Sequence, residues 1–173
     1  ITRLDGLILT HYDRDHAGGV PFLAERIEIE RVYLPMTEDA DGCLQGVLDA
    51  VPEQIPIDSE LTISFGDAQI QIFPAKDAGS GNDSCASVLF QRGKCDTLIT
   101  GDLSADAERQ LLADYALPDL ELAGDLEAVG LERLCVDLGE DLVGVVSLGA
   151  DHDGSVAAAL AGRRRRARRG ERV

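Results

Sequence analysis

Two histidines and two aspartates occur together near the start of the chain, in the segment HYDRDH at residues 11–16. The segment directly follows an apolar run, LDGLILT, of the kind that forms a buried strand. Imidazole nitrogens and carboxylate oxygens are ligands that zinc and manganese bind. We therefore expect His11 and Asp13 to hold one ion, and Asp15 and His16 to hold a second. Two ions roughly 3.5–4 Å apart can activate water and clamp a phosphoryl or acyl oxygen. The alternative is a polar surface turn, which seldom combines these four side chains beneath a strand end.

The elements around this segment predict an α/β chain. Periodicity, turn residues and prolines indicate strands at 4–10, 27–34, 61–65, 68–73, 87–91, 97–100 and 142–148, and helices at 20–26, 38–51, 105–115 and 131–138. The strongest local signal is Gly66-Asp67, which is typical of a hairpin turn between two alternating runs. The apolar run at 4–10 would place the HYDRDH segment in the loop after the first strand.

Length and charge limit the possible classes of protein. The chain has 173 residues, the size of one domain, with 32 acidic against 16 basic residues and a net charge of −16. Residues 163–173 hold seven of the arginines, so the rest of the chain is more acidic still. Such a charge repels nucleic acid unless metal ions or a local basic strip offset it. No apolar run approaches the roughly 20 residues of a membrane span. The chain opens on ITRLDG without a signal peptide, which is typical of a piece of a longer protein.

The motif HYDRDHAGG resembles the HxHxDH signature of the metallo-β-lactamase superfamily, with Asp13 at the position of the middle histidine. Within the superfamily, the chain is most similar to the hydrolase-like domain of competence DNA-uptake proteins of the ComEC type. The segments that carry this resemblance are LDGLILTHYDRDHAGGV, SGNDSCASVLFQ and CDTLITGDLSADAERQLL. The resemblance implies a partial αββα sandwich that lacks its first strands, over residues 1–150. An Arg-rich, disordered tail would follow at residues 151–173.

The resemblance also assigns roles to individual residues. It implies that His11 and Asp13 bind the first metal and that Asp15 and His16 bind the second, with Asp15 also orienting the nucleophilic water as the catalytic residue. Asp102, at the end of the LITGD strand, would be the bridging carboxylate. Gly101 would let Asp102 turn into a cleft; taken alone, Asp102 would be interpreted as a helix N-cap.

Three further positions are candidates with weaker support. Asn82 and Ser84 fall where the family has an NxxS-like segment near the substrate, although a simple Gly-Asn-Asp turn is an equal interpretation. The family's later HHGS segment is absent, because the corresponding stretch reads LPDLELAGDLEAVG. His152 could replace that lost ligand or match a later GHP-type segment, and Asp125 is a weaker substitute.

The resemblance implies a metal-dependent hydrolase with two divalent ions, zinc or manganese, and no nucleotide cofactor. Its substrate would be single-stranded DNA, cleaved as a phosphodiester during competence-related uptake. The parent protein would carry a polytopic membrane domain, and this chain would be its soluble domain at the cytoplasmic membrane. Two alternatives stay open: a hydrolase of thioesters or lactones, and a degenerate fragment that folds and binds metal weakly without turnover.

Overall fold

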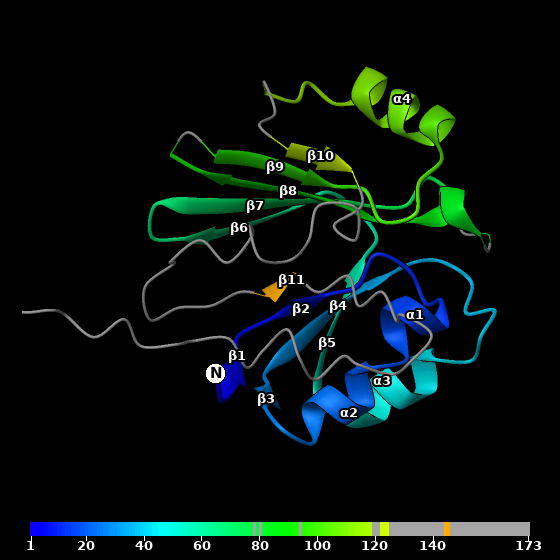
Figure 1. Cartoon of the computed structure of the whole chain (residues 1–173), viewed down its shortest axis with the longest axis vertical. Helices are drawn as coiled ribbons and strands as arrows, with labels where there is room; N and C mark the ends of the chain where they lie inside the picture. Colours follow the sequence, from blue (N-terminus) through cyan, green and yellow to red (C-terminus); the bar gives the residue numbers. More distant parts are fainter. Residues whose placement is uncertain (78, 80, 94, 119–121, 125–143, 146–173) are drawn as a thin grey trace, which may run out of the picture.

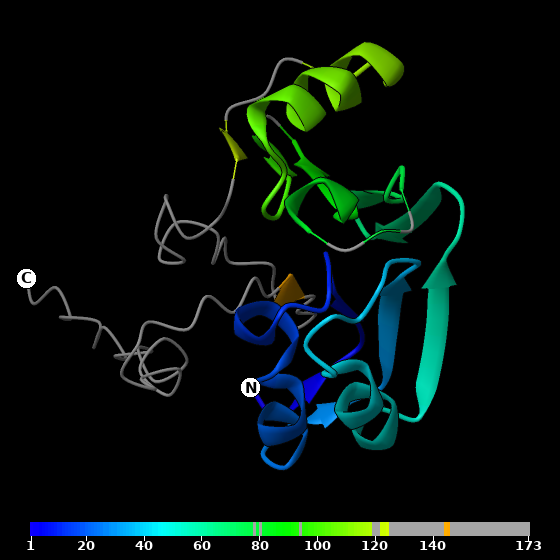
Figure 2. The same cartoon turned by 90° about the vertical axis from the view of Figure 1, so that its right-hand side faces the viewer.

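Four layers make up the part of the chain that the computed structural model describes: residues 1–118, 122–124 and 144–145, apart from 78, 80 and 94. A layer of helices covers a four-stranded sheet, a five-stranded sheet packs on the other face of that sheet, and one helix covers the far side (Figure 2). This helix–sheet–sheet–helix order confirms the layered α/β class expected from the sequence.

The N-terminal part of the chain, together with β11, forms the parallel sheet and the helices that cover it. The sheet contains, in spatial order, β11 (Gly144–Val145), β2 (Leu7–Ile8), β4 (Arg31–Pro35) and β5 (Glu53–Ile57), and each neighbouring pair is parallel. Parallel neighbours need crossover connections, and these contain α1 (Arg14–Ala17), α2 (Val20–Ala24) and α3 (Leu44–Ala50). A separate parallel pair joins β1 (Arg3–Leu4) to β3 (Glu28–Ile29).

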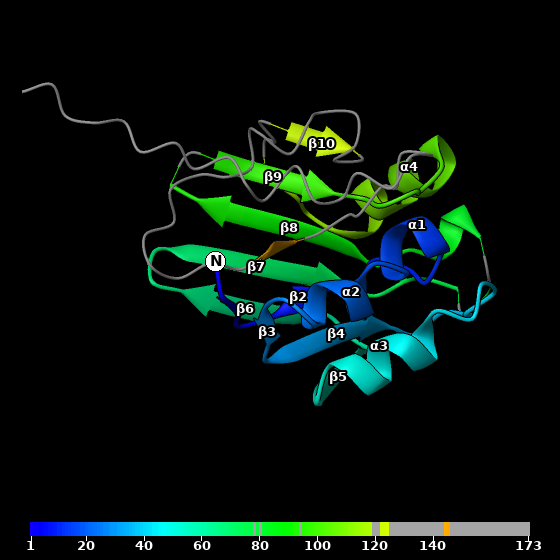
Figure 3. The same cartoon turned by 60° about the horizontal axis from the view of Figure 1, so that its bottom comes forward.

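The second sheet is a meander with one added parallel strand. Consecutive antiparallel pairs join β6 (Leu61–Phe65), β7 (Ala68–Phe73), β8 (Ser87–Arg92) and β9 (Cys95–Ile99), and β10 (Leu122–Gly124) lies parallel to β9. Helix α4 (Ala105–Asp114) lies on the outer side of this sheet, and the short 3₁₀ helix η1 (Asn82–Ser84) precedes β8 (Figures 1 and 3).

Side chains that alternate along the strands divide the core into three apolar clusters, one at each interface between layers. In β2, Leu7 belongs to the cluster under the helices, whereas Ile8 belongs to the cluster between the sheets. In β8, Val88 faces the other sheet and Leu89 packs with Leu111 of α4. Full burial of each such side chain is worth about 1.5–3 kcal/mol. These two strands are therefore apolar on both faces, as a four-layer fold requires.

Several predicted elements are confirmed with small changes of boundary. The hairpin around Gly66-Asp67, the next strand pair and the helix from Ala105 lie where the sequence places them. The predicted strand at 142–148 contains β11, while the predicted helix at 131–138 and the proposed boundary at residue 150 lie outside the described residues.

The structure corrects other predicted elements. Residues 4–10 and 27–34 are each split into two short strands, and α3 begins only at Leu44 rather than at residue 38. Both oxygens of Asp39 accept hydrogen bonds from the amides of Cys43 and Leu44, so this carboxylate caps the helix and fixes its start. Within the described residues, no helix is long and apolar enough to span a bilayer.

The two sheets meet closely at one edge, where β2 ends and β8 begins. The amide of Ala86 donates to the carbonyl of Thr10 over 2.8 Å. Gly101 lies against the same threonine with a φ of +59°, and a Cβ there would lie 3.0 Å from Thr10 Cβ and Oγ1. The glycine is required both by its left-handed backbone and by this close approach.

Replacing Gly101 by alanine should destabilise the fold by about 2–4 kcal/mol, because the left-handed conformation costs about 1–2 kcal/mol and the methyl group would collide with Thr10. The matched control is Gly66→Ala in the hairpin turn. Gly66 has a φ of +53° but nothing within 4 Å of its Cβ position, so only the backbone penalty applies. Urea unfolding of both variants measures the difference, and equal losses of stability would contradict the close-packing argument.

Candidate metal centre

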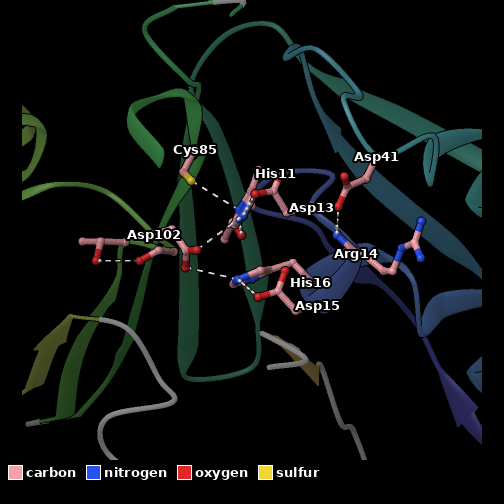
Figure 4. Close-up of polar contacts among 11 residues, drawn as sticks. His11, Asp13, Arg14, Asp15, His16, Asp41, Cys85 and Asp102 are labelled. Atoms are coloured by element: carbon pink, nitrogen blue, oxygen red, sulfur yellow. Dashed lines mark hydrogen bonds and ion pairs between the residues drawn. The ribbon is translucent and has the colours of Figure 1, made fainter. Parts of the chain in front are cut away.

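His11, His16 and Asp102 converge at the edge where the sheets meet, with one ligand atom from each lying within 4.8 Å of the others (Figure 4). His11 lies in the loop that follows β2, His16 on α1, and Asp102 in the loop between β9 and α4. Both histidines are buried, each 3% exposed. The side chain of Asp102 is 24% exposed, so the cluster has a buried side and a side open to solvent.

The ring of His11 is held from one side only. Its Nδ1 lies 3.0 Å from Thr10 Oγ1 and 3.3 Å from Cys85 Sγ, both at hydrogen-bonding distance. Its Nε2 is buried and has no hydrogen-bond partner, although such an atom normally has one. The ring is thus fixed through Nδ1 while Nε2 points at the cluster.

Asp102 links the two histidines through its two carboxylate oxygens. Oδ1 lies 3.1 Å from His16 Nε2 and Oδ2 lies 3.8 Å from His11 Nε2. The imidazole rings stack at a tilt of 44°, with centroids 4.0 Å apart. Burial and the neighbouring His16 lower the pKa of His11, against the opposing charge of Asp102. The lowered pKa of His11 favours its neutral imidazole, which is the form that binds metals.

Asp13 and Asp15 lie at the solvent-exposed rim of the cluster. Asp13 Oδ2 is 3.8 Å from His11 Nε2, and Asp15 Oδ2 is 3.9 Å from His16 Nε2. Their side chains are 40% and 51% exposed. The structure therefore brings all five predicted ligand residues to one place, with the imidazoles inside and these two carboxylates outside.

The short helix α1 carries Asp15 and His16, and its start is capped by a residue from elsewhere in the chain. Asp13 holds the N-cap position, yet its side chain makes no capping hydrogen bond. Instead, the amide of Arg14 donates to Oδ2 of Asp41, which lies in the loop between β4 and α3 (Figure 4). Because the Asp13 carboxylate does not cap the helix, it lies beside His11 instead. A helix of four residues gains little from its own hydrogen bonds, so this contact from another loop matters for its position.

The remaining predicted residues are not part of this cluster of ligand atoms. Asn82 and Ser84 form η1, where Asn82 is exposed and Ser84 is buried. This 3₁₀ helix leads directly into Cys85, whose thiol reaches His11. His152 and Asp125 lie outside the described residues, and their predicted roles stay predictions.

Sequence reasoning did not identify Cys85, Thr10 or Asp41 as contributors to the site. Burial raises the pKa of the Cys85 thiol to about 12, so the group stays protonated and supports His11 as a neutral neighbour. Nothing in the spacing of the cysteines indicates this contact. The aspartates of the loop at 36–43 could have indicated that this loop caps a helix, because aspartate is among the preferred residues at helix starts.

The residues present fit a divalent metal ion. Two imidazoles and a carboxylate form a suitable ligand set for zinc, iron or manganese. The buried, unpartnered Nε2 of His11 has the acceptor geometry that a coordinating nitrogen needs, and its other nitrogen is already engaged, as in metal-binding histidines generally. His11, His16 and Asp102 would hold the ion, with Asp13 and Asp15 at its solvent side.

Comparisons with known proteins show the family to which the fold belongs. The sequence model of the family described as "Metallo-beta-lactamase superfamily" matches residues 1–164. The chain is 28% identical to ComE operon protein 3 of Bacillus subtilis (strain 168) over 118 residues, covering 65% of this chain and 15% of that protein. It is 31% identical to a hydroxyacylglutathione hydrolase of Shewanella sp. (strain ANA-3) over 130 residues, covering 67% of this chain and 45% of that enzyme. The chain thus spans less than half the length of either relative.

A search of solved structures matches the chain to CmlA, a diiron β-hydroxylase from Streptomyces venezuelae. The sequence identity is 19%, the match covers 71% of this chain and 25% of that one, and the TM-score is 0.49.

Replacing Asp41 by alanine should weaken metal binding by about tenfold, because α1 loses the contact that holds Asp15 and His16 in place. Asp41→Asn keeps a hydrogen-bond acceptor and should stay within about threefold of the parent chain. Competition with a chromophoric chelator measures the affinity, and hydrogen exchange at the Arg14 amide reports the cap itself.

Asp39→Ala is the matched control, since Asp39 lies in the same loop and caps α3 instead. It should lower the stability of the fold without a comparable loss of metal affinity. An equal loss of affinity in the Asp39 and Asp41 alanine variants would show that the loop acts only through general stability or charge.

Proposed function

Because the chain belongs to the metallo-β-lactamase superfamily, we propose that it is a metal-dependent hydrolase that cleaves phosphodiester bonds in DNA. The observation that carries the proposal is the convergence of His11, His16 and Asp102, with the buried Nε2 of His11 directed at the other two. The resemblance to hydrolase-like domains of the ComEC type favours DNA as substrate, and the match to ComE operon protein 3 is in line with that resemblance.

We propose that the site holds two divalent ions, zinc or manganese. His11 and Asp13 would hold the first, Asp15 and His16 the second, and Asp102 would contribute its carboxylate. Such ions supply Lewis-acid chemistry: they acidify water and stabilise negative charge that develops on the substrate.

In this proposal, Asp15 would accept the proton of the attacking water. Its carboxylate is half exposed and 3.9 Å from His16 Nε2, so it lies at the boundary between the ligands and solvent. The buried rings of His11 and His16 form the dry inner wall of the site. The carboxylate of Asp102 faces the Nε2 atoms of both rings, at 3.1 Å from His16 and 3.8 Å from His11.

The proposed setting is a larger protein that handles single-stranded DNA at the cytoplasmic membrane. A polytopic membrane segment of that protein would lie outside this chain, and its other domains would supply a basic path for DNA, which offsets the net charge of −16 on this chain. Residues 1–150 would be the hydrolase domain and residues 151–173 its tail.

A second candidate is hydrolysis of a thioester or lactone. The acidic composition favours it, because a neutral acyl substrate is not repelled by a chain with 32 acidic residues. The similarity to a hydroxyacylglutathione hydrolase points the same way.

Metal content and substrate preference test the proposal together. Elemental analysis of the purified full chain should give two equivalents of metal, and His11→Ala and Asp102→Ala should each lose most of it. With Mn²⁺ or Zn²⁺ present, the chain should hydrolyse bis(p-nitrophenyl) phosphate, and Asp15→Asn should lower kcat about 10²–10⁴-fold.

Glu60→Gln, which changes an exposed carboxylate in the turn before β6, is the control and should leave both measurements unchanged. Turnover confined to an acyl thioester would replace the phosphodiester proposal by the second candidate. A chain that binds no metal and hydrolyses neither substrate would overturn both.

A further inference from the structure

The backbone that carries Asp102 has to set the direction of its carboxylate. Among the described residues, the ion pairs of this carboxylate go to His11 and His16, and no hydrogen bond from a third side chain orients it. Carboxylates that bind metals are usually oriented by such an outer hydrogen bond. Gly101, which directly precedes Asp102, has a φ of +59° and no side chain of its own to hold the turn. The direction of Asp102 therefore depends on what fixes the chain on either side of Gly101.

Thr100, the residue before Gly101, is anchored through its side chain. It is buried, with 2% of its surface exposed, and its Oγ1 donates a hydrogen bond to Oε1 of Glu108 over 2.9 Å. The carbonyl of Gly101 is a second acceptor at 3.5 Å, which is long for a hydroxyl donor. The single hydroxyl proton of Thr100 is therefore directed at Glu108.

Glu108 reaches Thr100 from the first turn of α4. Its amide donates to the carbonyl of Ser104, the N-cap residue, over 2.9 Å, so its backbone belongs to the helix while its side chain turns back to the end of β9. A glutamate in the first turn also suits the helix dipole. That effect requires no partner, so it does not explain why the carboxylate is partly buried against a buried hydroxyl.

The hydrogen bond spans the segment that carries the metal ligand. Thr100 and Glu108 are eight positions apart, and Asp102 lies between them. Inside this span, Oδ1 of Asp83 accepts a hydrogen bond from the Ser104 amide over 3.2 Å, in contact with solvent. The bond from Thr100 is the shorter and the more buried of the two. Without it the turn before Asp102 would be free to rotate, and the carboxylate would leave the imidazoles.

We propose that Glu108 is a positioning residue of the metal centre: by binding Thr100 it holds the turn at Gly101, and with it the carboxylate of Asp102, against the two histidines. Glu108 is not itself a ligand, because the cluster of ligand atoms consists of His11, His16 and Asp102. The inference rests on the metal binding that the proposed function requires, and it is independent of the substrate. Metal affinity therefore tests it without turnover.

The test measures binding of Co²⁺ and Zn²⁺ to the full chain by competition with a chromophoric chelator. Glu108→Ala should weaken binding by about tenfold. Glu108→Gln removes the charge but keeps an oxygen acceptor, so it should retain most of the affinity. Thr100→Val removes the donor from a side chain of similar shape and should match Glu108→Ala.

Two further measurements separate positioning from a general loss of stability. The double variant Thr100→Val/Glu108→Ala should bind no more weakly than either single variant, because the two side chains act as one unit. The visible absorption of bound Co²⁺ reports the geometry of its ligands. It should change in Glu108→Ala and in Thr100→Val, and Glu108→Gln should restore it.

Ser104→Ala is the matched control. The Oγ of Ser104 accepts a hydrogen bond from the Ala107 amide, so this variant removes the cap of the same helix and leaves Thr100 in place. It should lower the urea midpoint of the metal-free chain without changing the metal affinity or the Co²⁺ spectrum. An equal loss of affinity in Ser104→Ala, or a Glu108→Gln variant as weak as Glu108→Ala, would overturn the positioning role.

The outcomes for Glu108 and for the hydrolase are distinct. The expected pattern of affinities, with hydrolysis of neither the phosphodiester nor the thioester, would leave the positioning role in place and refute the hydrolase. Phosphodiester hydrolysis by the parent chain, with unchanged metal affinity in Glu108→Ala, would do the reverse. A parent chain that binds neither ion and hydrolyses neither substrate would overturn both.

Discussion

The contact between Thr10, Ala86 and Gly101 is the constraint on which the site depends. The Ala86 amide donates a hydrogen bond to the Thr10 carbonyl, and a Cβ at Gly101 would lie only 3.0 Å from the Thr10 side chain. This contact fixes the loop after β2 against the loop after β9. The residues that follow in each loop, His11 and Asp102, consequently face each other. Neither sheet alone would bring an imidazole and a carboxylate to this distance.

Cys85 strengthens the same junction from the side of β8. Its Sγ lies 3.3 Å from His11 Nδ1, which is at hydrogen-bonding distance. Because burial keeps the thiol protonated, the group adds a fixed dipole rather than a charge beside the ligands. The site therefore has a neutral, buried half formed by Thr10, His11 and Cys85, and a hydrated half formed by carboxylates.

The sequence predicts the parts of this structure that depend on local pattern. The hairpin at Gly66-Asp67 follows from turn chemistry, and the HYDRDH segment is recognisable because its ligands are close in sequence. Strand β5 was missed, because Pro56 and the exposed Glu53 make its segment look like a loop until β4 pairs with it. Helix α1 is too short to show a helical period. The cap from Asp41 and the contact from Cys85 depend on which loops meet in space, and no local pattern specifies that.

The separation of the site's parts along the chain affects how the protein acquires its fold. Cys85 and His11 are 74 positions apart, and, apart from β11, the strands of the parallel sheet all precede those of the meander sheet in the chain. Contacts over such distances form slowly, because the chain loses loop entropy before it gains packing energy. The isolated HYDRDH segment can offer an ion only part of its ligands before the second sheet docks. An ion that binds the completed cluster would selectively stabilise the docked halves, by an amount that grows with its concentration over Kd. Metal availability would then set the lifetime of the folded chain as well as its chemistry.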